Sequence, residues 1–457
     1  MDISPYKSDM VNSLKELIGI KSVKDIPQPK MPYGKEVFDA LEFMSKLSSR
    51  LGFDFTNLDG RIGFIDYGSG DETLAVLTHL DVVPAGDGWT FDPFAGDITD
   101  GKMYGRGTID NKGPAIASLY ALKMIKDQKI PLNKKVRLVF GCDEESGWTD
   151  IDYLKSHEKD PDIAFSPDGD YPIINTEKGL LHVSLTAKCM SNSEDGIKIV
   201  SFDSGSRANI VPNSAQCMLA GDYDEIALSA DKFFKQNNIE YTIEKNSKGA
   251  IIKVKGVASH GSRPKDGVNA ASYLANMLLT LPLASGEFKD ALKSFYGKIK
   301  LNHDGSGIEL DIKDELSGAL TFNVGKVSYD KYNLEIVVDI RYPVSYDAEF
   351  IMSKLKYHFG YIFEIAVKHK LDSHFVDEES DLVKDLKFVY EEVTGKKAYC
   401  ISIGGATYAR AFSNAVTFGP KFPGAPSLEH GPDEYIILEE LYLNATMIAK
   451  AITKICE

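Results

Sequence analysis

Five short segments of this chain carry side chains that bind metal ions or transfer protons. Four of them follow short apolar runs that are typical of buried strands. Because the carboxyl ends of parallel strands meet at one edge of an open α/β sheet, we expect these side chains to converge. Two histidines and three or more carboxylates in one crevice suit a pair of divalent cations that split a bond with water. The segments are Thr78–Asp81, Gly107–Gly113, Asp143–Gly147, Ser166–Gly169 and Ser427–Gly431.

The first candidate pair is His79 and Asp81, two residues apart at the end of an apolar run. Residues i and i+2 of a strand share a face about 6.6 Å apart. The imidazole could bind a metal while the carboxylate orients that ring or a neighbouring group. The alternative is a core histidine hydrogen-bonded to its neighbour, and this motif alone does not exclude it.

The carboxylates of two further segments also allow two interpretations. Asp110 lies in a glycine-rich turn that opens a helix, where it could bind a metal or cap the helix. Glu144 and Glu145 are adjacent, so their repulsion costs stability unless a positive group lies beside them. One could bind a metal while the other takes a proton from bound water. The alternative is a solvated acidic loop.

Two single residues complete this set. Asp168 follows a proline and an apolar run. His430 lies in a proline-rich loop that could hold a distant histidine in the site, although taken alone it could be a surface residue.

The composition limits the classes of function. The chain has 457 residues, 43% hydrophobic and 26% charged, with a formal net charge of −15. This length predicts two or three domains. The negative charge argues against nucleic acids and anionic membranes as partners. We find neither a basic segment followed by an apolar one near Met1 nor an apolar stretch of about 20 residues, so we predict no secretory signal and no membrane span.

The five cysteines are scattered and form no CxxC motif. This pattern argues against a disulfide framework and against a thiolate zinc site. We therefore predict a cytoplasmic enzyme.

The apolar pattern divides the chain into three parts. In residues 1–180, apolar runs at 73–77, 136–140 and 163–165 alternate with helical patterns, which predicts an α/β domain whose mixed sheet has helices on both faces. In residues 181–371, strands with polar alternation predict an inserted α+β domain with one sheet face open to water. Because His430 lies in residues 372–457, we predict that this third part completes the first domain.

Together and in this order, the segments resemble the M20 family of metallopeptidases. The middle of the chain is similar to the PepV-like dipeptidase branch of that family. The resemblance spans essentially the whole chain, and no ligand position is replaced. It rests on His79–Pro84, Gly105–Pro114, Asp143–Gly147, Phe165–Asp168 and Glu429–Glu434.

The resemblance implies two divalent metal ions at the strand ends. Asp110 would bridge them, with a cis peptide bond to Asn111. The ligand set suits zinc, which we expect, and manganese and cobalt are the alternatives. The remaining ligands would be His79 and Asp168 for one ion, and Glu145 and His430 for the other.

The resemblance also implies the residues that act beside the metals. Glu144 would be the general base and then the general acid, and Asp81 would support the ligands. In the inserted domain, a lid in this family, His260 would donate to the oxyanion. Arg341 and Asn209 would hold the free carboxylate of the substrate.

Single residues of the inserted domain have simpler interpretations as well. Taken alone, Arg341 could belong to a surface ion pair, and His260 could be a turn residue. A loop of the third part that contains Gly404 and Gly405 resembles a family loop on the carboxylate side of the substrate.

The length of the insertion carries a further implication. It is nearly twice as long as the single lid of most family members, and so resembles two lids in one chain. Single lids pair with a second subunit that lends its histidine. A doubled lid therefore predicts a monomer that supplies His260 itself.

The predicted function is a dipeptidase that hydrolyses short peptides with a free C-terminal carboxylate. The alternative within the family is an N-acyl-amino-acid deacylase or a carboxypeptidase, which would share the metal ligands. A binding or regulatory protein that kept only the fold would lack the base or a ligand, whereas Glu144 and all five ligands are present. The predicted partner is a small peptide, and neither nucleic acid nor membrane.

Overall fold

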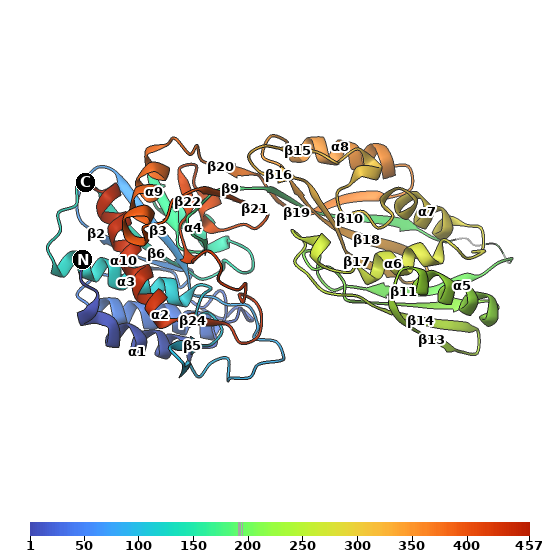
Figure 1. The fold of residues 1–457 in the computed structure, drawn as a ribbon, viewed down its shortest axis with the longest axis horizontal. Helices are drawn as coiled ribbons and strands as arrows, with labels where there is room; N and C mark the ends of the chain where they lie inside the picture. The colour runs from blue at the N-terminus through green and yellow to red at the C-terminus, as the bar shows by residue number, and fades with distance from the viewer. Residues whose placement is uncertain (191–192, 194) are drawn as a thin grey trace. The chain divides into compact units, whose positions relative to one another are not determined.

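The computed structural model describes residues 1–190, 193 and 195–457, which form two compact units. The first unit comprises Met1–Thr176, Phe375–Ile401 and Ala406–Glu457, and the second comprises Glu177–His374 and Ser402–Gly405. Both chain termini belong to the first unit (Figure 1). The sequence predicts boundaries after residues 180 and 371, and the units change after Thr176 and His374.

The short segment Ser402–Gly405, predicted with the catalytic domain, belongs instead to the second unit. Two hydrogen bonds explain this placement. The N–H of Lys178 donates to the carbonyl of Ile403 at 2.9 Å, and Nη1 of Arg341 donates to the carbonyl of Gly404 at 2.6 Å.

The first unit is built on a mixed sheet in the order β1-β2-β6-β3-β7-β22-β9-β20. Its central strands β6, β3, β7 and β22 are parallel, whereas β1 and β2 are antiparallel at one edge. The middle of β3 is buried on both faces, which explains its continuous apolar sequence. The strands are β1 (Thr56–Leu58), β2 (Ile62–Tyr67), β3 (Thr73–His79), β6 (Lys135–Gly141), β7 (Ile163–Ser166), β9 (Ile173–Glu177), β20 (His374–Phe375), β21 (Cys400–Ile403) and β22 (Ala415–Thr417).

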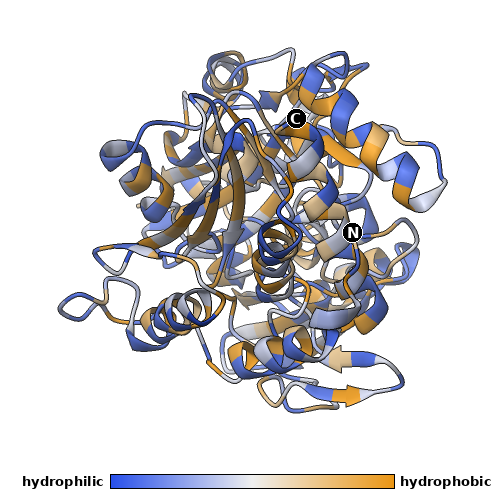
Figure 2. Cartoon of the chain, turned by 90° about the vertical axis from the view of Figure 1, so that its left-hand side faces the viewer, coloured by the Kyte–Doolittle hydropathy of each residue, from blue (hydrophilic) through white to orange (hydrophobic). Residues whose placement is uncertain are grey.

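Helices cover both faces of this sheet, as predicted. Leu74 and Val76 of β3 belong to the larger core, whereas Ala75 and Leu77 face a smaller core that contains residues of α4 and η4. Apart from the helix of residues 112–127, which is buried along nearly its whole length, the helices of the larger core carry both hydrophobic and hydrophilic residues (Figure 2), which is the pattern of helices with one buried face. These helices are α1 (Lys7–Ile18), α2 (Lys35–Arg50), α3 (Lys112–Asp127), α9 (Asp381–Thr394) and α10 (Leu438–Ile455), and the smaller core uses α4 (Thr149–His157) and η4 (Tyr408–Ala411).

Helix α9 illustrates how local sequence sets the ends of an element. The side chain of Ser380 accepts a hydrogen bond from the N–H of Val383 and caps the helix. Gly395 ends the helix with a φ of 67°, a conformation that glycine adopts without strain.

Short strand pairs place two site loops side by side. β24 (Tyr435–Ile437) pairs with β5 (Lys102–Tyr104), so the loop before β24 lies beside the loop after β5. The remaining short strands are β4 (Asp97–Thr99), β8 (Gly169–Asp170), β23 (Pro420–Lys421), β15 (Lys313–Asp314) and β16 (Gly318–Ala319), with 3-10 turns η1 (Ser4–Tyr6), η2 (Pro264–Asp266) and η3 (Ser306–Ile308).

The second unit is built on an antiparallel sheet in the order β13-β14-β12-β11-β17-β18-β10-β19. Over the described residues, the β11–β17 pair joins two halves of four strands each. Helices α5 and α6 contact the first half, α6 also contacts β17, and α7 and α8 contact the second half. The elements are β10 (Gly179–Lys188), β11 (Lys198–Ser204), β12 (Ser214–Ala220), β13 (Glu240–Lys245), β14 (Gly249–Lys255), β17 (Thr321–Tyr329), β18 (Asn333–Tyr342), β19 (Glu364–Leu371), α5 (Tyr223–Gln236), α6 (Ala270–Leu278), α7 (Glu287–Ile299) and α8 (Ala348–Phe359).

Across the described part of the chain, every helix is too short or too polar to span a lipid bilayer.

Candidate metal centre

Three segments of the site begin at the carboxyl ends of neighbouring parallel strands. His79 is the last residue of β3, Glu144 and Glu145 follow β6, and Asp168 follows β7. Because β6, β3 and β7 are adjacent and parallel, these ends lie at one edge of the sheet.

Asp110 occupies the centre of the cluster. Its Oδ1 lies 3.0 Å from Nε2 of His79, and its Oδ2 lies 3.1 Å from Nε2 of His430. The Asp110–Asn111 peptide bond is cis. The N-cap residue of α3 is Asn111, so the alternative role of Asp110 as a helix cap is wrong. One carboxylate thus faces both histidines.

The predicted ligands and the predicted base form two adjoining groups. In each group, one ligand atom from each residue lies within 4.8 Å of the others. Glu145 Oε1 is also 2.9 Å from Nε2 of His430, and its side chain is only 9% exposed, so the alternative of a solvated acidic loop is wrong. The groups are His79, Glu144 and Asp168, and Asp110, Glu145 and His430.

Asp81 orients both its own histidine and the glutamate pair. Its backbone carbonyl lies 3.0 Å from Nδ1 of His79. A carbonyl can only accept, so Nδ1 carries the hydrogen and Nε2 is the nitrogen directed at Asp110. The Asp81 carboxylate accepts the N–H groups of Glu144 at 3.2 Å and Glu145 at 3.0 Å. Asp81 therefore contributes to the site by orienting His79, Glu144 and Glu145.

Asn111 is a positioning residue that the sequence reasoning missed. Its Nδ2 donates to Oδ1 of Asp168 at 2.8 Å and to the carbonyl of Pro167 at 2.7 Å. Its Oδ1 accepts the N–H of His79 at 3.3 Å. One buried amide thus connects the ends of β3 and β7.

The sequence also did not reveal the buried ion pair of Arg106 and Glu434, in which Nη1 and Oε2 lie 2.5 Å apart. Nη2 of Arg106 donates to the carbonyl of Gly431, next to His430, at 3.1 Å. Oε1 of Glu434 accepts three N–H groups of the loop that carries Asp110. The pair therefore links the two loops that supply Asp110 and His430. The three donors are Gly107 at 3.0 Å, Ile109 at 2.9 Å and Asp110 at 3.3 Å.

Lys112 connects this loop to the first helix. Its fully buried ammonium donates to the carbonyls of Leu17 at 3.1 Å and Ile20 at 2.6 Å. Burial lowers the pKa of Lys112 to about 7, although the negative charges of Glu434 and Asp81 oppose that shift.

The carboxylates of the cluster have perturbed acidities because their charges are crowded. Burial raises the pKa of Glu144 well above its usual value, and nearby Asp168, Glu145 and Asp110 add to this effect against His79. Burial and the charge of Asp110 raise the pKa of Glu145 to about 7.

The two histidines show the opposite balance. Burial alone would lower the pKa of His79, but the surrounding carboxylates raise it well above its usual value. Burial is likewise outweighed at His430, where Asp110 and Glu145 raise the pKa to about 11. The edge of the sheet is therefore a strong attractor of positive charge.

Among the predicted substrate residues of the second unit, Arg341 contacts a buried carboxylate, that of Asp339. Nε and Nη2 of Arg341 donate to it at 2.6 and 2.8 Å, so the alternative of a surface ion pair is wrong. The carbonyl of Asn209 accepts the N–H of Gly261, the residue after His260, at 2.7 Å. Gly405 follows Gly404, whose carbonyl binds Arg341. The sequence alone did not identify Asp339 as the partner of Arg341.

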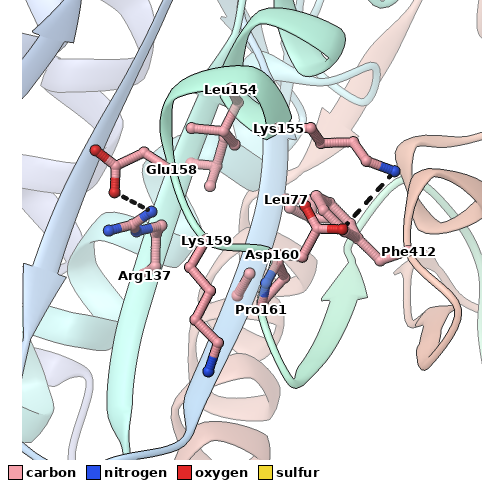
Figure 3. Close-up of a pocket in the computed structure, with 11 residues that line it drawn as sticks. Leu77, Arg137, Leu154, Lys155, Glu158, Lys159, Asp160, Pro161 and Phe412 are labelled. Carbon is pink, nitrogen blue, oxygen red and sulfur yellow. Dashed lines mark ion pairs between the residues drawn. The ribbon is translucent and has the colours of Figure 1, made fainter.

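A cavity beside the sheet of the first unit is lined by none of these residues (Figure 3). Its lining includes ion pairs between Arg137 and Glu158 and between Lys155 and Asp160, and the apolar side chains of Leu77 and Phe412. Its volume is about 10 Å³, the space of roughly one water molecule. It is too small to hold a peptide.

Histidines and carboxylates clustered at the carboxyl ends of parallel strands suit a metal-dependent hydrolase. The comparison with known families makes this specific. Residues 75–454 match the Peptidase family M20/M25/M40, and the chain belongs to that family. It is therefore a hydrolase, and membership implies divalent metal binding, as predicted.

Curated relatives span the whole chain. "Putative dipeptidase YtjP" of Bacillus subtilis (strain 168) is 39% identical over 468 residues, covering 100% of this chain and 99% of the relative. "Putative dipeptidase SH1171" of Staphylococcus haemolyticus (strain JCSC1435) is 32% identical over 464 residues, covering 99% and 98%.

Solved structures of this family share the fold. Human carnosine dipeptidase 1 has a TM-score of 0.63 at 16% identity, with 99% of this chain and 97% of that chain covered. The dipeptidase Dug1p of Saccharomyces cerevisiae has a TM-score of 0.61 at 15% identity, with 99% and 96% covered.

Proposed function

We propose that this protein is a dipeptidase that requires two divalent cations and hydrolyses short peptides with a free C-terminal carboxylate. The observation that carries the proposal is Asp110, whose two oxygens face His79 on one side and His430 on the other. The names of the full-length relatives support the choice of a dipeptide substrate.

The residues present fit two cations. Each group offers an imidazole nitrogen together with carboxylate oxygens, a donor set that suits zinc, manganese or cobalt. We propose zinc first. Bound cations would polarise the peptide carbonyl and make a shared water more acidic. Asp110 would be shared by both ions, His79 and Asp168 would hold one, and Glu145 and His430 would hold the other.

Glu144 would transfer the proton. With cations bound beside it, its carboxylate would accept a proton from the attacking water as the water oxygen bonds to the peptide carbon. When the carbon–nitrogen bond breaks, the same proton passes to the leaving amine. Asp81 supports this role because it holds the N–H of Glu144 and fixes the start of that side chain.

The second unit would recognise the rest of the peptide. We propose that Arg341 and Asn209 bind the substrate carboxylate with the loop of Gly404 and Gly405, and that His260 donates a hydrogen bond to the oxyanion. The buried pair with Asp339 supports this because it holds the Arg341 guanidinium in one orientation.

We further propose that the protein acts as a monomer in the cytoplasm. The two four-stranded halves of the second unit support a chain that supplies its own His260. All five cysteines are free, which suits a reducing compartment. An obligate dimer in a sedimentation experiment would contradict the monomer.

A turnover panel tests the proposed substrate class. Purified protein loaded separately with zinc, manganese or cobalt is offered dipeptides, longer peptides and N-acyl amino acids, and we expect the highest kcat/KM for dipeptides. Preference for N-acyl amino acids would identify a deacylase, and preference for longer peptides a carboxypeptidase. Absence of turnover with every cation would contradict an enzymatic function.

A further inference from the structure

The turn that carries His260 in the second unit is fixed through its backbone. The N–H of Gly261 donates to the carbonyl of Asn209 at 2.7 Å, and the N–H of Arg263 donates to the carbonyl of His260 at 2.8 Å. A Cβ atom at Gly261 would lie 2.8 Å from Oδ2 of Asp339 and 3.0 Å from Cα of Asn209. Only glycine fits this position, so His260 starts from a fixed backbone.

The imidazole of His260 receives two contacts from Ser262 on the same ring nitrogen. Nδ1 lies 2.7 Å from Oγ of Ser262 and accepts the backbone N–H of Ser262 at 3.3 Å. A backbone N–H can only donate, so Nδ1 is the acceptor. In the neutral ring the hydrogen is therefore on Nε2.

Ser262 can approach the imidazole because Gly404 leaves space for it. A Cβ atom at Gly404 would lie 2.7 Å from Cβ of Ser262, so any larger residue would push this serine away. The carbonyl of Gly404 is itself held by Nη1 of Arg341 at 2.6 Å. Hydrogen bonds thus link Asp339, Arg341 and Gly404, and Gly404 limits the space beside Ser262.

We propose that Ser262 is a positioning residue that keeps His260 in the tautomer with its hydrogen on Nε2. This inference rests on the proposed function, in which His260 donates a hydrogen bond to the developing oxyanion. With the hydrogen on Nδ1 instead, Nε2 would present a lone pair to that negative charge and oppose the reaction. The hydroxyl of Ser262 adds its hydrogen bond to that of the backbone N–H and so further favours the productive tautomer.

A double-mutant cycle separates this role from general support of the turn. We expect Ser262→Ala to lower kcat for a dipeptide about fivefold to tenfold, the value of one neutral hydrogen bond, and to leave KM within twofold. His260→Ala should lower kcat about 10²-fold to 10³-fold, as for loss of one oxyanion donor. In the His260→Ala background, Ser262→Ala should have no further effect.

Ser259 provides the matched control. Its Oγ donates to the carbonyls of Arg263 at 2.6 Å and His260 at 3.2 Å, so it holds the same turn without touching the imidazole. Ser259→Ala should leave kcat within twofold. Equal losses in the Ser259 and Ser262 variants, or an equal effect of Ser262→Ala with and without His260, would overturn the proposal.

Nitrogen-15 shifts of the His260 ring give a readout besides activity. In the native protein, Nδ1 should resonate as an acceptor nitrogen and Nε2 as a protonated one, and Ser262→Ala should move both shifts toward their tautomeric average, whereas Ser259→Ala should not. Unchanged shifts in the Ser262 variant would overturn the proposal. Normal turnover by His260→Ala would instead refute the oxyanion role in the proposed function, while the shifts would still report whether Ser262 sets the tautomer.

Discussion

The two units treat buried charge in opposite ways. At the sheet edge of the first unit, carboxylates are crowded together, and burial raises the pKa of Glu144 and Glu145. In the second unit, burial of Asp339 is outweighed by Arg341 and His182, and its pKa falls to about 2. The two histidines of the first cluster offset only part of its negative charge, whereas Asp339 in the second unit is paired with Arg341 and His182. The comparison separates a cluster whose carboxylates outnumber its basic side chains from a carboxylate that is paired with basic side chains.

The largest expected effect comes from the proton-transfer residue of the first unit. Glu144→Gln keeps the shape of the side chain but cannot take a proton, so kcat should fall about 10²-fold to 10⁴-fold. Metal content by elemental analysis should stay at the native level. The matched variant Glu145→Gln should lose metal. A Glu144 variant that turns over dipeptides normally would show that the assigned base is wrong.

The next prediction tests whether a buried ion pair of the first unit, like that of Arg341 and Asp339 in the second, stabilises the fold. Glu434→Gln would leave the buried guanidinium of Arg106 without its counter-charge, and should lower the free energy of unfolding by about 3–5 kcal/mol. The measurement is urea denaturation. The control is Glu439→Gln, which breaks an exposed pair with Lys7 and should cost less than about 1 kcal/mol. Equal costs for the two variants would contradict a linking role for Arg106 and Glu434.

Removal of metal should affect the first unit selectively. A free cation at about 100 times its dissociation constant stabilises the folded state by about 3 kcal/mol, and chelation should remove this contribution. Calorimetry with and without chelator checks the shift in Tm. Asp110→Asn should abolish the dependence on metal, and Asp339→Asn should preserve it. A chelator effect that persists in Asp110→Asn would place the cations elsewhere.

The smallest effect is the acid sensitivity of the second unit. The pKa of Asp339 is lowered from 3.8 to about 2, so its contribution is present above pH 4 and lost as pH falls toward 2. The shift corresponds to about 2 kcal/mol. Hydrogen exchange of β18 should show weaker acid dependence in Asp339→Asn than in the native protein.

Asp150 in the first unit supplies the control of opposite sign. Burial, followed by the charge of Asp81, raises its pKa from 3.8 to about 7. The stability associated with this group is therefore present below pH 4 and lost as pH rises toward 7. Identical pH trends for β6 and β18 would contradict the comparison between the units.

The sequence predicts the parts of the site that follow from the pattern of apolar residues in neighbouring positions. The apolar runs before His79 and Asp168 identify buried strands, and parallel strands bring their ends together. The central position of Asp110 and the distant His430 came from the family resemblance. The structure then brings these residues together as one cluster.

The missed residues are those whose roles arise from tertiary contacts. Arg106 and Glu434 lie in segments that carry the family resemblance, but nothing in the local pattern shows that they pair with each other. Asp339 lies in a strand whose alternation does not distinguish a buried charge from an exposed one. Ser402–Gly405 joins the second unit through hydrogen bonds of its carbonyls, which sequence patterning does not reveal.

The anchoring of Lys112 to the carbonyls of Leu17 and Ile20 has a practical consequence for protein engineering. A shortened version that starts after α1 would leave the Lys112 ammonium, which lies two residues from Asp110 in the sequence, without the Leu17 acceptor. Protease trimming of the amino-terminal helix should therefore inactivate the enzyme even though no catalytic side chain is removed. Added tags are better placed before Met1 than substituted for the first helix.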